Sequence, residues 1–235
     1  MASDPAMTAK LLQLVNSAFF GLARRISNPM EAVLFLGVGR VRSLVLSLHV
    51  FSCFERLHLP DFSIEKVWAH SMSTGRIAQQ IAALETGDRA IAEEAYVAGI
   101  LHDIGKVMLA SSLTDQYRRA LAIARERNLS IESAEREVFG VTHAEVGAYL
   151  LGLWGLPVSI VEAVGLHHMP EQSTVDCFSP LTAVHAASAI ENELTASSPG
   201  LARAPLDMTY LAKFGIGYQL GLWRAAAQEL LKKVA

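Results

Sequence analysis

Apolar residues recur at intervals of three and four along most of the chain, and alternating strand-like patterns of useful length are hard to find. This spacing is typical of helices that bury one face. We therefore expect an all-α protein. The predicted helices cover about residues 5–18, 29–35, 39–55, 63–84, 88–110, 114–127, 130–138, 142–153, 157–168, 179–194, 207–214 and 217–233, with ends uncertain by about two to four residues.

Three stretches interrupt this pattern where proline, glycine and serine collect. Leu59-Pro60-Asp61 separates an N-terminal helical part from the middle, Gly155-Leu156-Pro157 separates two helices, and 195–205 is the most loop-like segment. We expect one domain over 1–235. Its parts are an N-terminal helical part at 1–58, a central core at 59–194 and a pair of C-terminal helices at 195–235.

Local signals place two predicted helix ends beside histidines. Thr142-His143-Ala144-Glu145 fits a capping box, which puts His143 in a first helical turn. The helix that opens at Pro157 stops before Met169-Pro170, so His167 and His168 are expected at its C-terminus. The carbonyl groups at such an end favour a positive imidazole or a bound cation. At the other end of the chain, Asp4 is expected to cap a helix that starts at Pro5.

Composition narrows the class of protein. Of 235 residues, 51% are hydrophobic and 18% charged, which is enough for a buried core, and the formal net charge of −3 argues against a protein that grips nucleic acid through its phosphates. Cys53 and Cys177 stand alone, as in a reducing cytoplasm. The apolar run 32–51 contains two arginines and so predicts no membrane span, and the N-terminus lacks a signal-peptide layout.

The segment VAGILHDIGKVML sets His102 and Asp103 in an apolar stretch, where burying both is costly unless each finds a partner, a proton or a metal. Further histidines stand in VWAHS, VTHAEVG and GLHHMP, namely His70, His143, His167 and His168. Taken singly, each is read as a buried histidine bonded to backbone. Taken together, imidazoles with a carboxylate form the ligand set that suits iron, zinc, manganese or nickel.

Asp103 and Lys106 carry the catalytic hypothesis. A carboxylate in the position of Asp103 can bridge two metal ions about 3.5–4 Å apart, as in sites where a metal-bound hydroxide attacks phosphorus. Lys106, one turn along, is placed to meet a phosphate oxygen, and the alternative is a lysine exposed to solvent at a helix start. If the protein is an enzyme, these two residues are its expected catalytic groups.

The order H…HD…H…HH resembles the HD superfamily of metal-dependent phosphohydrolases, whose fold is a helical bundle. The wider context resembles its HDOD (HD-related output domain) branch through LLQLVNSAFFG, EAVLFLGVGRVRSLVLSL, VWAHS, AGILHDIGK, EREVFGVTHAEVGAYLLGLWGLP and VEAVGLHHMP. These segments follow one another from about Asp4 to Pro170. The resemblance implies an output domain of bacterial signal transduction.

The resemblance also implies two metal sites with different completeness. The first site, His70, His102 and Asp103, lacks the second aspartate of HD hydrolases, because Ser188 stands at that position. The second site, Asp103, His143, His167 and His168, keeps every ligand position. His185, one turn before Ser188, either substitutes for the missing ligand or fills space. The Gly-Tyr-Pro loop of cyclic-di-GMP phosphodiesterase relatives is absent after the double histidine, which disfavours that activity.

Three functions remain open on these grounds. The favoured one is a non-catalytic signalling module that acts through protein contacts, with its histidines retained as a polar or metal-stabilised core. The second is a metal-dependent phosphohydrolase acting on a nucleotide or phosphate ester. The third is a neutral cluster that binds nothing. Since HDOD proteins usually carry helices before the segment at Asp4, we also expect self-association or docking to an upstream signalling domain.

Overall fold

The structure is a computed structural model, and it describes residues 5–16, 26–53, 59, 62–195 and 205–232. Within these ranges it is all-α, as predicted, and its β structure is limited to an isolated bridge between Leu59 and Phe62. The α-helices and 3-10 helices are α1 (Pro5–Val15), α2 (Pro29–Leu36), α3 (Val38–Cys53), α4 (Ile64–Thr86), α5 (Arg89–Leu101), α6 (Ile104–Ser112), α7 (Thr114–Glu126), α8 (Ile131–Phe139), α9 (His143–Leu153), α10 (Val158–Leu166), η1 (Pro170–Gln172), α11 (Pro180–Thr195), α12 (Met208–Lys213), η2 (Gly217–Gln219) and α13 (Leu220–Lys232).

One predicted helix is wrong in its length. The stretch 88–110 forms two helices, because α5 ends at Leu101 and α6 begins at Ile104. Asp103 has φ −99° and ψ 8°, which ends the regular helix between them. Both helices bury apolar faces, so the apolar spacing continues across the break and hides it. The predicted cap at Asp4 and the expected boundary at residue 58 lie outside the described residues.

Side-chain caps fix where the helices around the site begin. Ser63 accepts a hydrogen bond from the backbone N–H of Lys66 at the start of α4, and Asp88 accepts one from Ala90 at the start of α5. The predicted capping box of Thr142 and Glu145 is present at the start of α9. Each such cap contributes about 1 kcal/mol to stability and pins the position of the first turn.

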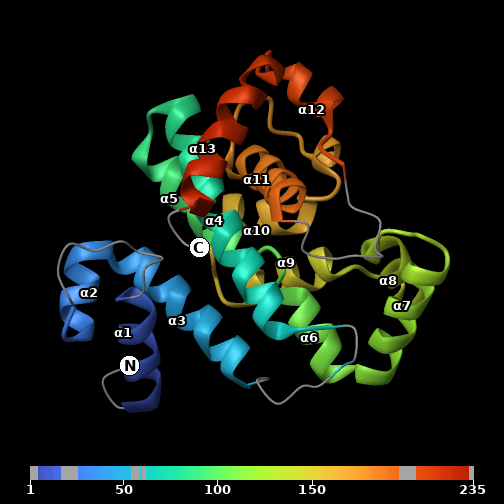
Figure 1. Ribbon diagram of the computed structural model, residues 1–235, viewed down its shortest axis with the longest axis horizontal. Coiled ribbons are helices and arrows are strands. Elements are labelled where there is room, and N and C mark those ends of the chain that lie inside the picture. The colour runs from blue at the N-terminus through green and yellow to red at the C-terminus, as the bar shows by residue number, and fades with distance from the viewer. Residues whose placement is uncertain (1–4, 17–25, 54–58, 60–61, 196–204, 233–235) are drawn as a thin grey trace.

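The helices pack around α4, α5 and α11, and Figure 1 shows α4 and α11 near the middle of the molecule. Helix α10 packs against α5, α9 and α11, while α6 packs against α9. The α7–α8 pair lies on one side and the α1–α3 group on the other, where α3 contacts α5 (Figure 1). Helix α13 covers α4 and α11, and Trp223 donates a hydrogen bond to Glu85 at 2.8 Å.

Glycines allow two helix pairs to approach at backbone distance. A Cβ at Gly99 would lie 2.6 Å from Cα of Gly75, so α4 and α5 cross with almost nothing between them. A Cβ at Gly105 would lie 2.0 Å from the carbonyl oxygen of His143, so α6 lies directly against the start of α9. The lack of a side chain at Gly105 of the LHDIGK segment therefore allows Asp103 to lie close to His143.

The N-terminal helices are tied to the rest of the chain by polar contacts. The Asn16 amide donates to the carbonyl of Ile26 at 2.8 Å and accepts from the Ile26 N–H at 2.7 Å, which holds the end of α1 against the segment that leads into α2. Arg42 of α3 donates to the carbonyl of Trp154, at the end of α9, at 3.1 Å. Helices long and apolar enough to cross a membrane are absent from the described part of the chain.

Candidate metal centre

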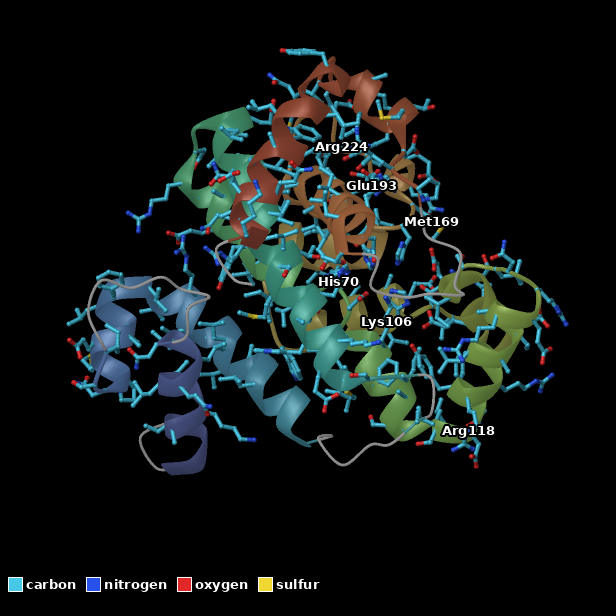
Figure 2. The ribbon with its side chains drawn as sticks, viewed as in Figure 1. His70, Lys106, Arg118, Met169, Glu193 and Arg224 are labelled. Carbon is cyan, nitrogen blue, oxygen red and sulfur yellow. The ribbon has the colours of Figure 1, made fainter. Side chains whose placement is uncertain are left out.

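Six residues from four places in the chain meet at the centre of the bundle. His70 comes from the second turn of α4, His102 and Asp103 from the α5–α6 break, and His143 from the first turn of α9. His167 and His168 follow the end of α10, as predicted. Figure 2 shows His70 and Lys106 close to the middle of the molecule. The structure thus brings together every residue of the two predicted sites.

The first site joins His70, His102 and Asp103. Nε2 of His70 lies 3.2 Å from Nε2 of His102, and the two atoms lie 3.8 and 3.6 Å from Oδ2 of Asp103. The three ligand atoms lie within 4.8 Å of one another, close enough to share one ion. His102 and Asp103 are buried and His70 is nearly so.

The second site lies on the other oxygen of the same carboxylate. Oδ1 of Asp103 lies 3.3 Å from Nε2 of His143 and 3.9 Å from Nε2 of His167. Nε2 of His168 lies 3.2 Å from Nε2 of His143 and completes the group. Asp103 therefore offers one oxygen to each site, which is the geometry of a bridging carboxylate.

Each of the five histidines turns Nε2 toward the centre and Nδ1 toward an acceptor. The Nδ1 atoms of His102 and His167 lie 2.7 and 2.8 Å from the carbonyl oxygens of Gly99 and Val164. A carbonyl can only accept, so Nδ1 carries the proton in both rings. Nε2 is then the atom with the free lone pair, as in a metal-ligating histidine.

The other three histidines are held by glutamates. Nδ1 of His143 lies 2.7 Å from Oε2 of Glu135, and that oxygen also accepts from the His143 backbone N–H at 2.8 Å. Nδ1 of His168 faces Glu132 at 3.3 Å, and Nδ1 of His70 contacts Oε2 of Glu191. A carboxylate behind an imidazole fixes the ring and makes its far nitrogen more basic.

Burial keeps three of these rings neutral. It lowers the pKa of His102 to about 3, and it also lowers the pKa of His167 and His168 well below the ordinary range, helped by the neighbouring imidazoles. Of the two alternatives expected at the C-terminus of α10, a positive imidazole or a bound cation, these lowered pKa values favour the bound cation, because loss of water outweighs the attraction of the helix carbonyls for a proton on the ring. The lone pairs at this helix end remain free to bind a metal.

His143 and Asp103 carry the opposite shifts. Burial alone would lower the pKa of His143, but the Glu135 carboxylate, with a contribution from Asp103, raises it to about 9. Burial likewise opposes the charged form of Asp103, yet the side chains of His102 and Lys106 hold its pKa well below the usual range. In the metal-free protein, His143 thus holds a proton beside a charged Asp103.

Lys106 is not the solvent-exposed lysine of the alternative interpretation. Its side chain is mostly buried, and Nζ lies 2.8 Å from Oδ2 of Asp103. Burial works against its charge, but Asp103 raises the pKa of Lys106. The ammonium group therefore neutralises the same oxygen that faces the first site.

Ser188 and His185 occupy distinct positions on α11. The hydroxyl of Ser188 lies 3.5 Å from Nε2 of His70, so this position does face the first site. His185 has both ring nitrogens engaged, Nδ1 with the carbonyl of His167 and Nε2 with the N–H of Asp207, at 2.8 and 2.9 Å. His185 is thus no substitute ligand, and it connects the His167 backbone to the start of α12.

The sequence interpretation missed the three glutamates. Glu135 stands in the quoted EREVFG segment, beside the buried Ala134, and Glu191 lies one turn after Ser188. Both are buried, at 0% and 3% exposed. A charged residue on the apolar face of a predicted helix was the available signal.

The residues present fit a divalent cation. Nε2 of His167 is buried without a hydrogen-bond partner among the described residues, and two pairs of imidazole Nε2 atoms face each other at 3.2 Å. Facing lone pairs repel unless a proton or a metal lies between them. Imidazole and carboxylate are the donors that suit iron, zinc, manganese and nickel.

Comparison with known proteins gives a family match. The family model of the HDOD domain matches residues 1–170. A Treponema pallidum protein of no described function is 31% identical over 168 residues, and ribonuclease Y of Thermus thermophilus is 30% identical over 177 residues. The matches cover 72% and 75% of this chain but 32% and 24% of those proteins, so the chain spans a third or less of these relatives.

Solved structures share the fold. An HDOD domain protein of unknown function from Geobacter sulfurreducens has a TM-score of 0.69 and 26% identity, covering 97% of this chain and 83% of that one. A candidate signal transduction protein from Marinobacter aquaeolei has a TM-score of 0.73 and 20% identity, covering 99% of this chain and 51% of that one. The second likeness is evidence of fold alone.

Proposed function

The chain belongs to the HDOD family, and we propose that it is a non-catalytic output module of bacterial signal transduction whose core is held by a metal centre. The observation that carries the metal centre is the common orientation of five imidazoles, each with Nδ1 on an acceptor and Nε2 turned inward. When bound, a metal would accept the inward-facing Nε2 lone pairs together with the oxygens of Asp103.

Two features favour a structural role for this centre. Asp103, His102, His143 and His167 are each at most 2% exposed, and structural metal sites are closed whereas catalytic sites keep an open position. In addition, the position that faces His70 holds the neutral hydroxyl of Ser188. Signalling would then take place through the outer surface of the bundle, by contact with other proteins.

A neutral cluster that binds nothing explains the first site less well than a bound metal does. A proton on His143 can bond to Asp103 or His168 and so satisfies part of the second site. In the first site, Nδ1 of His102 is committed to the Gly99 carbonyl and Nδ1 of His70 to Glu191. The hydroxyl of Ser188 lies 3.5 Å from Nε2 of His70. The two Nε2 atoms face each other at 3.2 Å, which a metal ion would accommodate by accepting both lone pairs.

A metal-dependent phosphohydrolase is the second candidate function. It is favoured by the two oxygens of Asp103, one for each site, and by Lys106, whose ammonium group could turn to a phosphate oxygen. The match to ribonuclease Y points the same way, toward phosphodiester cleavage. In this case Asp103 would hold both ions and Lys106 would bind the substrate anion.

An activity assay separates the two functions. The protein is incubated with Mn²⁺ or Fe²⁺ and a panel of phosphomonoesters, phosphodiesters and cyclic dinucleotides, beside Asp103→Ala. We expect no turnover by the natural chain. Turnover that Asp103→Ala abolishes would overturn the non-catalytic proposal. A gain of hydrolysis in Ser188→Asp alone would identify the missing carboxylate as the residue that separates this module from the enzymes.

A further inference from the structure

Helix α11 places two residues on the two nitrogens of His70. The Ser188 hydroxyl lies 3.5 Å from Nε2, on the side of the first site, and Oε2 of Glu191 contacts Nδ1 on the opposite side. Ser188 and Glu191 are three positions apart, so they share one face of α11. Both side chains are buried.

The first site is short of negative charge. Its ligand atoms come from two imidazoles and Asp103, and that carboxylate is shared with the second site and paired with Lys106 at 2.8 Å. The second site has Glu135 and Glu132 behind His143 and His168. Behind the first site the corresponding carboxylate is Glu191.

We propose that Glu191 supplies to the first site, through His70, the negative charge that a serine at position 188 cannot provide. This inference rests on the proposed metal centre. A carboxylate that accepts the Nδ1 proton makes Nε2 of the same ring a stronger, more anionic donor and fixes its direction. Glu191 is in this sense a positioning residue, which acts on the metal through His70.

The surroundings of Glu191 support this role. Glu191 is 3% exposed, and His70 is the partner that the described residues offer its carboxylate. A buried carboxylate is costly unless its charge is balanced. A cation on the far nitrogen of that imidazole would balance it. Glu193, two residues along, is exposed and pairs with Arg224 at 2.8 Å, away from His70 (Figure 2).

Zinc titration of the metal-stripped full chain tests this inference. Isothermal calorimetry with Zn²⁺ is run on the natural chain, Glu191→Gln and the matched control Glu193→Gln. We expect Glu191→Gln to weaken one of two zinc-binding steps by about 10- to 100-fold, the usual effect of losing a carboxylate behind a metal-bound histidine. The other step and both steps of Glu193→Gln should be unchanged.

A rescue variant distinguishes a charge effect from damage to the fold. Ser188→Asp added to Glu191→Gln should restore the weakened step, because it returns the charge on the other side of His70. If Glu191→Gln does not fold, Glu191→Asp keeps the charge but draws it back from Nδ1 by one methylene group and should show the same loss. Rescue that fails in a folded double variant would contradict the inference.

The outcomes also separate this inference from the proposed function. A natural chain that binds no zinc contradicts the metal centre itself. A natural chain that binds two zinc ions, with Glu191→Gln binding both equally well, contradicts the role of Glu191 and leaves the metal centre standing.

Discussion

Nε2 of His143 lies 3.3 Å from Oδ1 of Asp103, although the two residues belong to different helices. The contact depends on Gly105, where a Cβ would lie 2.0 Å from the His143 carbonyl oxygen. Behind the ring, Glu135 holds Nδ1 at 2.7 Å. The close packing of α6 against α9, the orientation of the His143 ring and the charge of Glu135 thus all act on the contact between His143 and Asp103.

Gly105→Ala tests the helix spacing. The added methyl group meets backbone, which cannot move aside alone, so α6 and α9 must separate. We expect a loss of about 1–3 kcal/mol in the free energy of unfolding, together with weaker zinc binding at the second site. Denaturant titration and calorimetry measure the two effects.

Gly152→Ala is the matched control for that substitution. Gly152 lies in α9, and a Cβ there would meet nothing within 4 Å. Alanine favours a helix by about 0.5–1 kcal/mol relative to glycine, so this variant should be more stable and bind zinc normally. Equal stability losses in the two variants would contradict the close approach at Gly105.

The raised pKa of His143 predicts how the stability of the metal-free protein depends on pH. This pKa is about 9 in the fold against an ordinary 6.5, so the folded state binds the proton more tightly. The stabilisation is fully present below about pH 6.5 and is lost as pH rises toward 9. Denaturant titration of chelator-treated protein between pH 6 and 9 should show that decline.

Glu135→Gln should flatten this dependence on pH, because the charge that raises the pKa of His143 is removed. Glu137→Gln serves as its control, since Glu137 lies at the surface and pairs with Arg127 at 2.9 Å. If the natural chain and Glu135→Gln lose stability equally from pH 6 to 9, the role given to Glu135 is wrong.

Lys106→Met tests whether a bound metal ion can replace the Lys106 ammonium group as the positive partner of Asp103. Without the ammonium group at 2.8 Å, the buried carboxylate of the metal-free protein has lost a charged partner, and stability should fall by about 3–5 kcal/mol. Zinc should restore most of that loss, because it replaces the missing positive charge. Thermal unfolding with and without zinc measures both effects.

Lys66→Met is the control for a lost lysine charge, since Lys66 is exposed near the start of α4. It should change stability by less than about 0.5 kcal/mol with or without zinc. If zinc leaves the Lys106→Met variant as unstable as before, metal does not bind at the Oδ2 side of Asp103.

Much of this architecture could be predicted from the sequence. Apolar spacing located the helices, and the capping signals placed His143 in a first turn and His167 at a helix end. The break at Asp103 could not be predicted, because apolar faces continue through both α5 and α6. The spacing of apolar residues shows which face of a helix is buried. It does not show where one predicted helix breaks into two to form a site.

The electrostatic state of the centre also depended on tertiary packing. Which acceptor stands behind each imidazole is decided by how α8 and α11 lie against α9 and α4, so Glu135 and Glu191 were missed. The choice between a protonated imidazole and a bound cation at His167 also needed the packing, because the helix-end effect is about 0.3–1 kcal/mol for an exposed group, whereas complete burial shifts a pKa further.

The central claim is that Asp103 and the five histidines hold metal as part of the fold. Elemental analysis of protein purified without added metal, beside Asp103→Ala, tests it most directly. We predict near-stoichiometric iron, manganese, zinc or nickel in the natural chain and its loss in Asp103→Ala. Metal-free natural protein that takes up no zinc, and whose melting temperature is the same with zinc and with chelator, would contradict the claim.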